Sequence, residues 1–149
     1  MRCVPLFLIV AVLGGLWSVG TTLAADTERV EATQFTVYPI GWVRKADGRT
    51  TIVVDKKYEP GLLGLEKFSH VWVLYWFDRN DTPEKRSILQ VHPGGDMRNP
   101  IRGVFATHSP ARPNLIAMSQ CKIISVKGNV IEIESIDAFP DTPVLDLKN

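Results

Sequence analysis

The residues best suited to hold a ligand lie together in one segment, residues 103–114, GVFATHSPARPN. His108 and Arg112 offer nitrogen donors, and each is followed within two residues by proline. Proline fixes φ and restricts the residue before it, so Ser109-Pro110 and Arg112-Pro113 predict a stiff, extended loop. Such a loop, following a short strand over residues 103–106, is suited to gripping a ligand. The alternative is an ordinary proline-rich connection, since surface loops are polar for many reasons.

The charge around this segment is uneven. Residues 97–131 contain no Asp or Glu but hold five Lys and Arg. A positive neighbourhood favours an anionic or phosphate-bearing partner, although a solvated basic edge would have the same composition. Arg2 is the only charge in the first 25 residues, so the rest of the chain is neutral overall. Nothing in the total charge indicates a nucleic-acid partner.

Other chemistries lack their sequence signals. The three histidines, His70, His92 and His108, do not have metal-ligand spacing, so no metal site is expected. No G-x-S-x-G elbow, G-x-G-x-x-G motif or Walker loop occurs, which leaves a hydrolytic triad, a Rossmann cofactor site and ATP hydrolysis without support. Cys121 lies in an alternating apolar segment and is predicted to be a buried, inert thiol rather than a nucleophile.

The first 25 residues have the pattern of a secretory signal peptide. Arg2 precedes a nearly continuous apolar run over residues 4–17, and small residues precede a cleavage point after Ala24 or Ala25. The prediction is export to the periplasm or the extracellular space. The alternative is an uncleaved membrane anchor, for which the run is short. If the N-terminus is misread, the protein is cytoplasmic.

The remaining chain reads as a series of short strands separated by turn signals. The stretch 71–77 is the most apolar and predicts a central strand buried on both faces. Lys127, Gly128 and Asn129 predict a tight hairpin turn. The expected fold is all-β, a small single-domain barrel or sandwich. Strands are predicted over residues 35–44, 50–55, 71–77, 87–92, 103–106, 121–126, 130–136 and 143–147, with a helical turn at most within 58–65 and polar loops over 78–85 and 137–142.

Three blocks together resemble one family. Residues 64–77 (GLEKFSHVWVLYWF), 103–119 (GVFATHSPARPNLIAMS) and 136–148 (IDAFPDTPVLDLK) are similar to the TsaA-like, or TrmO-type, domain. The resemblance implies a small dimerising β-barrel over residues 35–149. It also implies an S-adenosylmethionine-dependent enzyme that methylates N6 of a threonylcarbamoyl-modified adenosine in tRNA.

The resemblance also implies where the cofactor binds. Family members have contacts at the end of the aromatic strand, in the proline-rich segment, in the short apolar segment after it, and in the loop before the last strand. We expect Arg112 to contact the substrate, and no residue stands out as a catalytic base. The matching cofactor positions here are Phe77, Asp78, His108, Met118, Ile136, Asp137 and Ala138.

The sequence departs from the family pattern at two of these positions. Asp78 stands where the family usually has His, and His108 where it usually has Arg. An arginine is always charged and binds bidentately, so the cofactor would be held differently. The predicted export also conflicts with the cytosolic location of tRNA. Two alternatives follow: an exported, degenerate member that binds a nucleoside-like ligand without catalysis, or a structural β module for protein contacts.

Overall fold

The computed structural model describes residues 34–149, and the predicted signal peptide lies outside the described residues. Residues Phe35–Asn149 form one compact unit. Within the described residues, no helix is both long and apolar enough to span a membrane.

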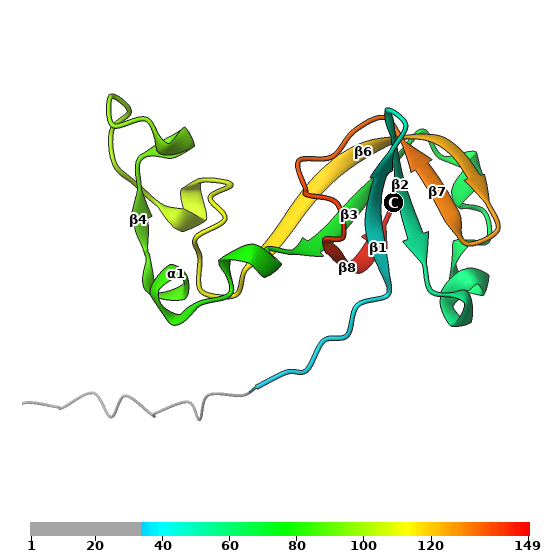
Figure 1. The fold of residues 1–149 in the computed structure, drawn as a ribbon, viewed down its shortest axis with the longest axis horizontal. Helices are drawn as coiled ribbons and strands as arrows, with labels where there is room; N and C mark the ends of the chain where they lie inside the picture. The colour runs from blue at the N-terminus through cyan, green and yellow to red at the C-terminus, as the bar shows by residue number, and fades with distance from the viewer. Residues whose placement is uncertain (1–33) are drawn as a thin grey trace, which may run out of the picture. The chain divides into compact units, whose positions relative to one another are not determined.

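Six antiparallel strands close into a barrel, which confirms the predicted all-β fold class (Figure 1). Going around the barrel, each strand is hydrogen-bonded to the next, and the last strand pairs with the first. In this order the strands are β1 (Gly41–Ala46), β2 (Arg49–Val54), β7 (Val130–Ile133), β6 (Ile116–Lys127), β3 (His70–Trp76) and β8 (Pro143–Lys148).

The barrel interior is filled by the inward-facing half of each strand. Alternate residues of a strand point to opposite faces, so each strand contributes every second side chain to the core. Most of these side chains are β-branched, which suits a pleated wall. Fully buried members of the core include Val43, Ile52, Val73, Ile131 and Val144.

Two tight turns connect neighbouring strands as the sequence predicts. Asp47 and Gly48 both have positive φ, at 51° and 73°, which matches the twist of the β1–β2 hairpin. Gly128, with φ of 57°, lies in the turn between β6 and β7, where Lys127 pairs with Val130. The predicted hairpin around Gly128 is therefore confirmed.

Several predicted strand limits are wrong. The first strand begins at Gly41 rather than Phe35, and Phe35 is 81% exposed. Residues 116–127 form one continuous strand, and β7 ends at Ile133. Strand β3 is buried on one face only, because its outward-facing residues are half-exposed. A closed barrel has a single interior, so a long apolar run does not require two buried faces.

The chain between β3 and β6 leaves the barrel as an excursion, residues 78–115, which we call the arm. Strands over 87–92 and 103–106 were expected here, but the arm contains mainly short helical turns and one two-stranded ribbon. Its elements are η3 (Asp78–Asn80), α1 (Pro83–Ser87), β4 (Gln90–Val91), η4 (Pro93–Gly95), β5 (Arg102–Gly103) and η5 (Val104–Ala106). Two further 3-10 turns, η1 (Lys56–Leu62) and η2 (Leu65–Lys67), lie between β2 and β3.

Local sequence explains why a helix begins where a polar loop was predicted. Thr82 is the N-cap of α1, and its hydroxyl accepts a hydrogen bond from the Lys85 amide at 3.3 Å. Pro83 occupies the first helical position, where its missing N–H has no cost. The arm returns to the barrel where the Phe77 amide donates to the Leu115 carbonyl at 2.9 Å.

Candidate functional site

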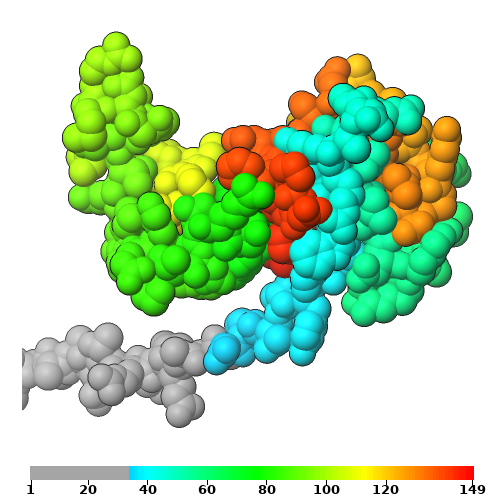
Figure 2. All heavy atoms as spheres, in the orientation of Figure 1, coloured from blue at the N-terminus to red at the C-terminus, as the bar shows by residue number. Residues whose placement is uncertain are grey.

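A cavity of about 710 Å³ lies where the end of β3, the proline-rich part of the arm, the start of β6 and the chain between β7 and β8 meet. We call the last of these the β7–β8 loop, residues 134–142. Figure 2 shows this stretch, in orange and red, against the cyan strand β1. The volume lies within the range of about 300–1,000 Å³ typical of small-molecule sites.

The structure brings most of the predicted site residues to this cavity. They come from four segments that are well separated in the sequence, so only the closed barrel places them together. Ile136 does not line the cavity, because its side chain is 7% exposed and packs in the barrel core. The predicted residues that do line it are Phe77, Asp78, His108, Arg112, Met118, Asp137 and Ala138.

One wall of the cavity is aromatic. Tyr75 lies near the end of β3, and Phe77 is the first residue after that strand. Their rings meet edge to face at a centroid distance of 5.7 Å. On the β7–β8 loop, Phe139 is 58% exposed and carries the guanidinium of Arg79 over its ring. Aromatic rings at a cavity wall offer apolar contact area to a flat ligand group.

The β7–β8 loop is fixed to strand β1 at several points. The Asp141 amide donates to the Val43 carbonyl at 2.8 Å, and the Val43 amide donates to the Thr142 carbonyl at 3.0 Å. Arg44 forms an ion pair with Asp141. Asp141 also has a left-handed backbone, with φ of 67°. This part of the loop is therefore held in one conformation by the barrel.

The proline-rich segment is ordered by its own hydroxyl groups. The Ser109 amide donates to Thr107 Oγ1, and the Ala111 amide donates to Ser109 Oγ, both at 3.2 Å. Arg112 Nη1 reaches the Ser109 carbonyl at 3.5 Å. These local bonds, together with the two prolines, give the stiff loop that the sequence predicts. His108 is exposed on it and Arg112 is half-buried.

Charges of both signs line the cavity. Asp78 and Asp137 supply carboxylates, whereas Lys45, Arg79 and Arg112 supply cations. A ligand carrying both an ammonium or sulfonium and a carboxylate would find complementary groups here. Among the described residues, no cluster of three or more His, Cys, Asp or Glu is arranged to hold a metal.

Comparison with known proteins decides the family. The tRNA-methyltransferase O N-terminal domain profile, TrmO_N, matches residues 32–149, which is most of the chain. The chain belongs to the TrmO N-terminal domain family. The predicted relationship is thereby confirmed.

Several relatives share the TrmO-type domain. A probable S-adenosyl-L-methionine-binding protein of Methanocaldococcus jannaschii is 46% identical over 110 residues, covering 74% of this chain and 87% of that protein. The human tRNA (adenine(37)-N6)-methyltransferase is 41% identical over 90 residues, covering 60% of this chain and 20% of the enzyme. A crystal structure of TrmO from P. aeruginosa superposes with a TM-score of 0.60 at 28% identity, covering 80% of this chain and 55% of that one. The chain thus spans about half the length of the solved TrmO.

The structure adds cavity residues of this TrmO-type domain that the sequence analysis missed. Lys45 lies in the β1–β2 hairpin and had no sequence signal, because its contacts are with residues about ninety positions away. Arg79 and Phe139 each adjoin a predicted residue, Asp78 and Ala138, so a wider window around those positions would have included them.

Proposed function

We propose that this TrmO-type domain binds S-adenosyl-L-methionine in the cavity between β3, the arm and the β7–β8 loop. The single observation that carries the proposal is the convergence on one cavity of six of the seven residues expected to contact that cofactor, with Arg112 beside them. The relatives named as S-adenosyl-L-methionine-binding proteins support the same ligand.

The residues present fit this cofactor. The aromatic side chains Phe77 and Phe139 offer flat apolar surface for an adenine ring. Asp78 and Asp137 are suited to the ammonium and sulfonium charges. Arg112, which the sequence analysis assigns to the substrate, is also suited to the cofactor carboxylate. All five lie on the wall of one cavity of about 710 Å³.

We further propose that the bound cofactor serves methyl transfer to an adenine N6 in tRNA, as in the relatives named for that reaction. In this reaction the substrate nitrogen forms a bond to the methyl carbon as the carbon–sulfur bond breaks. The electron pair passes to sulfur, and the nitrogen releases a proton to solvent or a base. The protein's part is to align the two reactants, because no described side chain of the cavity is assigned as the base.

Isothermal titration calorimetry on the full chain tests the binding proposal. We expect saturable one-site binding of S-adenosyl-L-methionine, weakened by Met118→Ala and unaffected by the matched control Met97→Ala. Met118 lines the cavity, and Met97 is an exposed arm residue outside it. An absence of heat at millimolar ligand would refute the proposal.

Transfer of a labelled methyl group to bulk tRNA tests the catalytic part separately. Binding without transfer would leave the cofactor site in place and favour the alternative of an exported, non-catalytic ligand-binding member. The sequence of residues 1–25 supports the proposal that the protein is exported. Fractionation of the producing cells, with recovery in the cytosol as the contradicting result, tests this location.

The expected homodimer is also a proposal. Leu89, Met97, Ile101 and Phe105 of the arm are 54–79% exposed, and burial against a second copy would remove their apolar surface from water. We expect sedimentation equilibrium to give a dimer, and Phe105→Asp to shift it toward monomer. A monomeric wild-type chain would refute this proposal.

A further inference from the structure

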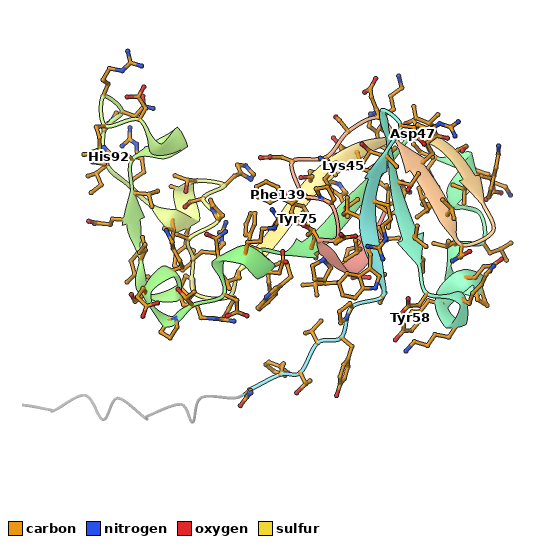
Figure 3. All side chains as sticks on the ribbon, viewed as in Figure 1. Lys45, Asp47, Tyr58, Tyr75, His92 and Phe139 are labelled. Carbon is orange, nitrogen blue, oxygen red and sulfur yellow. The ribbon has the colours of Figure 1, made fainter. Side chains whose placement is uncertain are left out.

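Two barrel side chains hold consecutive carbonyl groups of the β7–β8 loop. Lys45 Nζ donates to the Ile136 carbonyl at 3.0 Å, and Tyr75 Oη donates to the Asp137 carbonyl at 2.8 Å. Figure 3 shows Lys45, Tyr75 and Phe139 gathered in this region. Both donors also line the cavity.

The two donors come from the two strands that flank β8. Lys45 lies on β1 and Tyr75 on β3, and each of these strands pairs with β8. The loop that leads into β8 therefore accepts hydrogen bonds from the strands on both sides of β8 just before β8 begins. Neither contact follows from local sequence, since the partners lie 91 and 62 residues apart.

Fixing these carbonyls fixes the peptide units that follow them. A peptide unit is planar, so a carbonyl bound in one direction sets the direction of the next N–H group. The N–H groups of these two peptide units belong to Asp137 and Ala138, and they donate to no other described residue. Backbone donors left free at a cavity wall are available to a ligand, because they need a partner once water is displaced.

We propose that Lys45 and Tyr75 are positioning residues, which hold the Asp137–Ala138 wall in the conformation that receives the cofactor. This inference rests on the proposed function. Tyr75 is suited to the task because it is 3% exposed, and its hydroxyl has a second partner in Ser119 Oγ at 3.2 Å. Burial also raises the pKa of Tyr75, which keeps its hydroxyl protonated.

The first test compares two variants with matched controls. Lys45→Met and Tyr75→Phe each remove one donor and keep most of the side chain. Lys127→Met and Tyr58→Phe change the same residue types outside the cavity, and Figure 3 shows Tyr58 on the η1 side of the barrel. In calorimetry of the full chain we expect about 2- to 10-fold weaker S-adenosyl-L-methionine binding for each cavity variant, and no change for the controls.

Two additional variants separate positioning from general stability. Lys45→Arg retains a donor and is expected to restore most of the affinity. Because both residues hold the same wall, the double variant Lys45→Met/Tyr75→Phe should lose less than the product of the single effects. Unchanged affinity in Lys45→Met and Tyr75→Phe, whatever their stability, overturns the proposal. If Tyr75→Phe fails to fold, the affinity of Lys45→Met alone still tests the proposal, because Lys45 is exposed and its substitution leaves the core unchanged.

A ligand-free measurement distinguishes this inference from the proposed function. In the unliganded full chain, we expect ¹⁵N order parameters of Asp137 and Ala138 to fall in both cavity variants and to stay unchanged in both controls. If the loop responds in this way but the wild-type chain does not bind S-adenosyl-L-methionine, the proposed function is refuted and the positioning role of Lys45 and Tyr75 is retained. If the order parameters do not change in the two cavity variants, the positioning role of Lys45 and Tyr75 is refuted.

Discussion

The guanidinium of Arg79 lies over the ring of Phe139, with its Cζ atom 4.1 Å from the ring centroid. Arg79 belongs to η3, immediately after β3, whereas Phe139 belongs to the β7–β8 loop. Two walls of the cavity that are sixty residues apart in sequence are therefore in direct contact. A cation over an aromatic face contributes about 0.5–1 kcal/mol at an exposed site.

Loss of this contact should loosen the bound ligand. We expect Phe139→Leu to weaken S-adenosyl-L-methionine binding by about 2- to 5-fold, mainly through faster dissociation. Phe105→Leu is the control, because Phe105 is also an exposed phenylalanine but lies outside the cavity. Stopped-flow fluorescence measures the rates. Equal rates for the two variants would show that the Arg79–Phe139 contact has no part in binding.

Restoring the residue that the family usually has at position 108 should strengthen the site. We expect His108→Arg to tighten binding by about tenfold, since a guanidinium is always charged and donates bidentately to a carboxylate. His92→Arg is the control, as His92 lies on the arm with its Nδ1 at 2.7 Å from the Asn99 carbonyl (Figure 3). Calorimetry gives the affinities, and weaker binding by His108→Arg would contradict the expectation.

Asp78 and His108 both line the cavity, and each replaces the residue usual in the family. If they compensate for each other, the variants Asp78→His and His108→Arg should be coupled. The affinity of the double variant would then differ from the product of the single effects. Independent effects would show that the two replacements are unrelated.

The buried thiol predicts how stability depends on alkaline pH. Cys121 is 1% exposed, and burial raises the pKa of its thiol from 9.0 to about 11. The pKa of the thiol is higher in the folded state than in the unfolded state. The protonated thiol therefore contributes fully to the free energy of unfolding below pH 9, and this contribution is lost as pH rises toward 11. The loss should be on the order of 3 kcal/mol.

Cys121→Ser isolates this effect, because serine does not titrate in this range and can donate to the same Ser119 carbonyl. Urea unfolding of the full chain under reducing conditions measures the free energy at each pH. We expect the wild-type chain to lose more stability than Cys121→Ser between neutral and alkaline pH. Parallel pH profiles for the two proteins would refute the role of the thiol.

Gly41 should be intolerant of any side chain. A Cβ at this position would lie 2.5 Å from the Val53 carbonyl oxygen and 2.8 Å from the Val54 Cα, both of which are backbone atoms. Gly41→Ala is expected to cost about 1–3 kcal/mol of unfolding free energy. Gly61→Ala is the control, since a Cβ there meets nothing within 4 Å. Equal midpoints in urea would contradict the expected close packing of β1 on β2.

The sequence was sufficient for the fold class and for seven of the residues that line the cavity. Alternating apolar residues and the Gly-containing turns, such as Gly48 and Gly128, are local signals, and they predicted the hairpins correctly. The proline-rich segment also had its own signal in Pro110 and Pro113. The local pattern failed where strand formation depends on long-range pairing. A strand was predicted from Phe35, but among the described residues no strand pairs with this segment, so Phe35 is exposed.

Only the tertiary structure determined how the cavity is held. Residues such as His108 and Asp137 could be named from sequence, because each lies in a recognisable block. The sequence also assigned Ile136 to the cavity, but the loop turns its side chain into the barrel core. Lys45 and Tyr75 gain their roles from hydrogen bonds across 91 and 62 residues. Such contacts exist only once the barrel closes, because closure brings β1 and β3 to either side of β8.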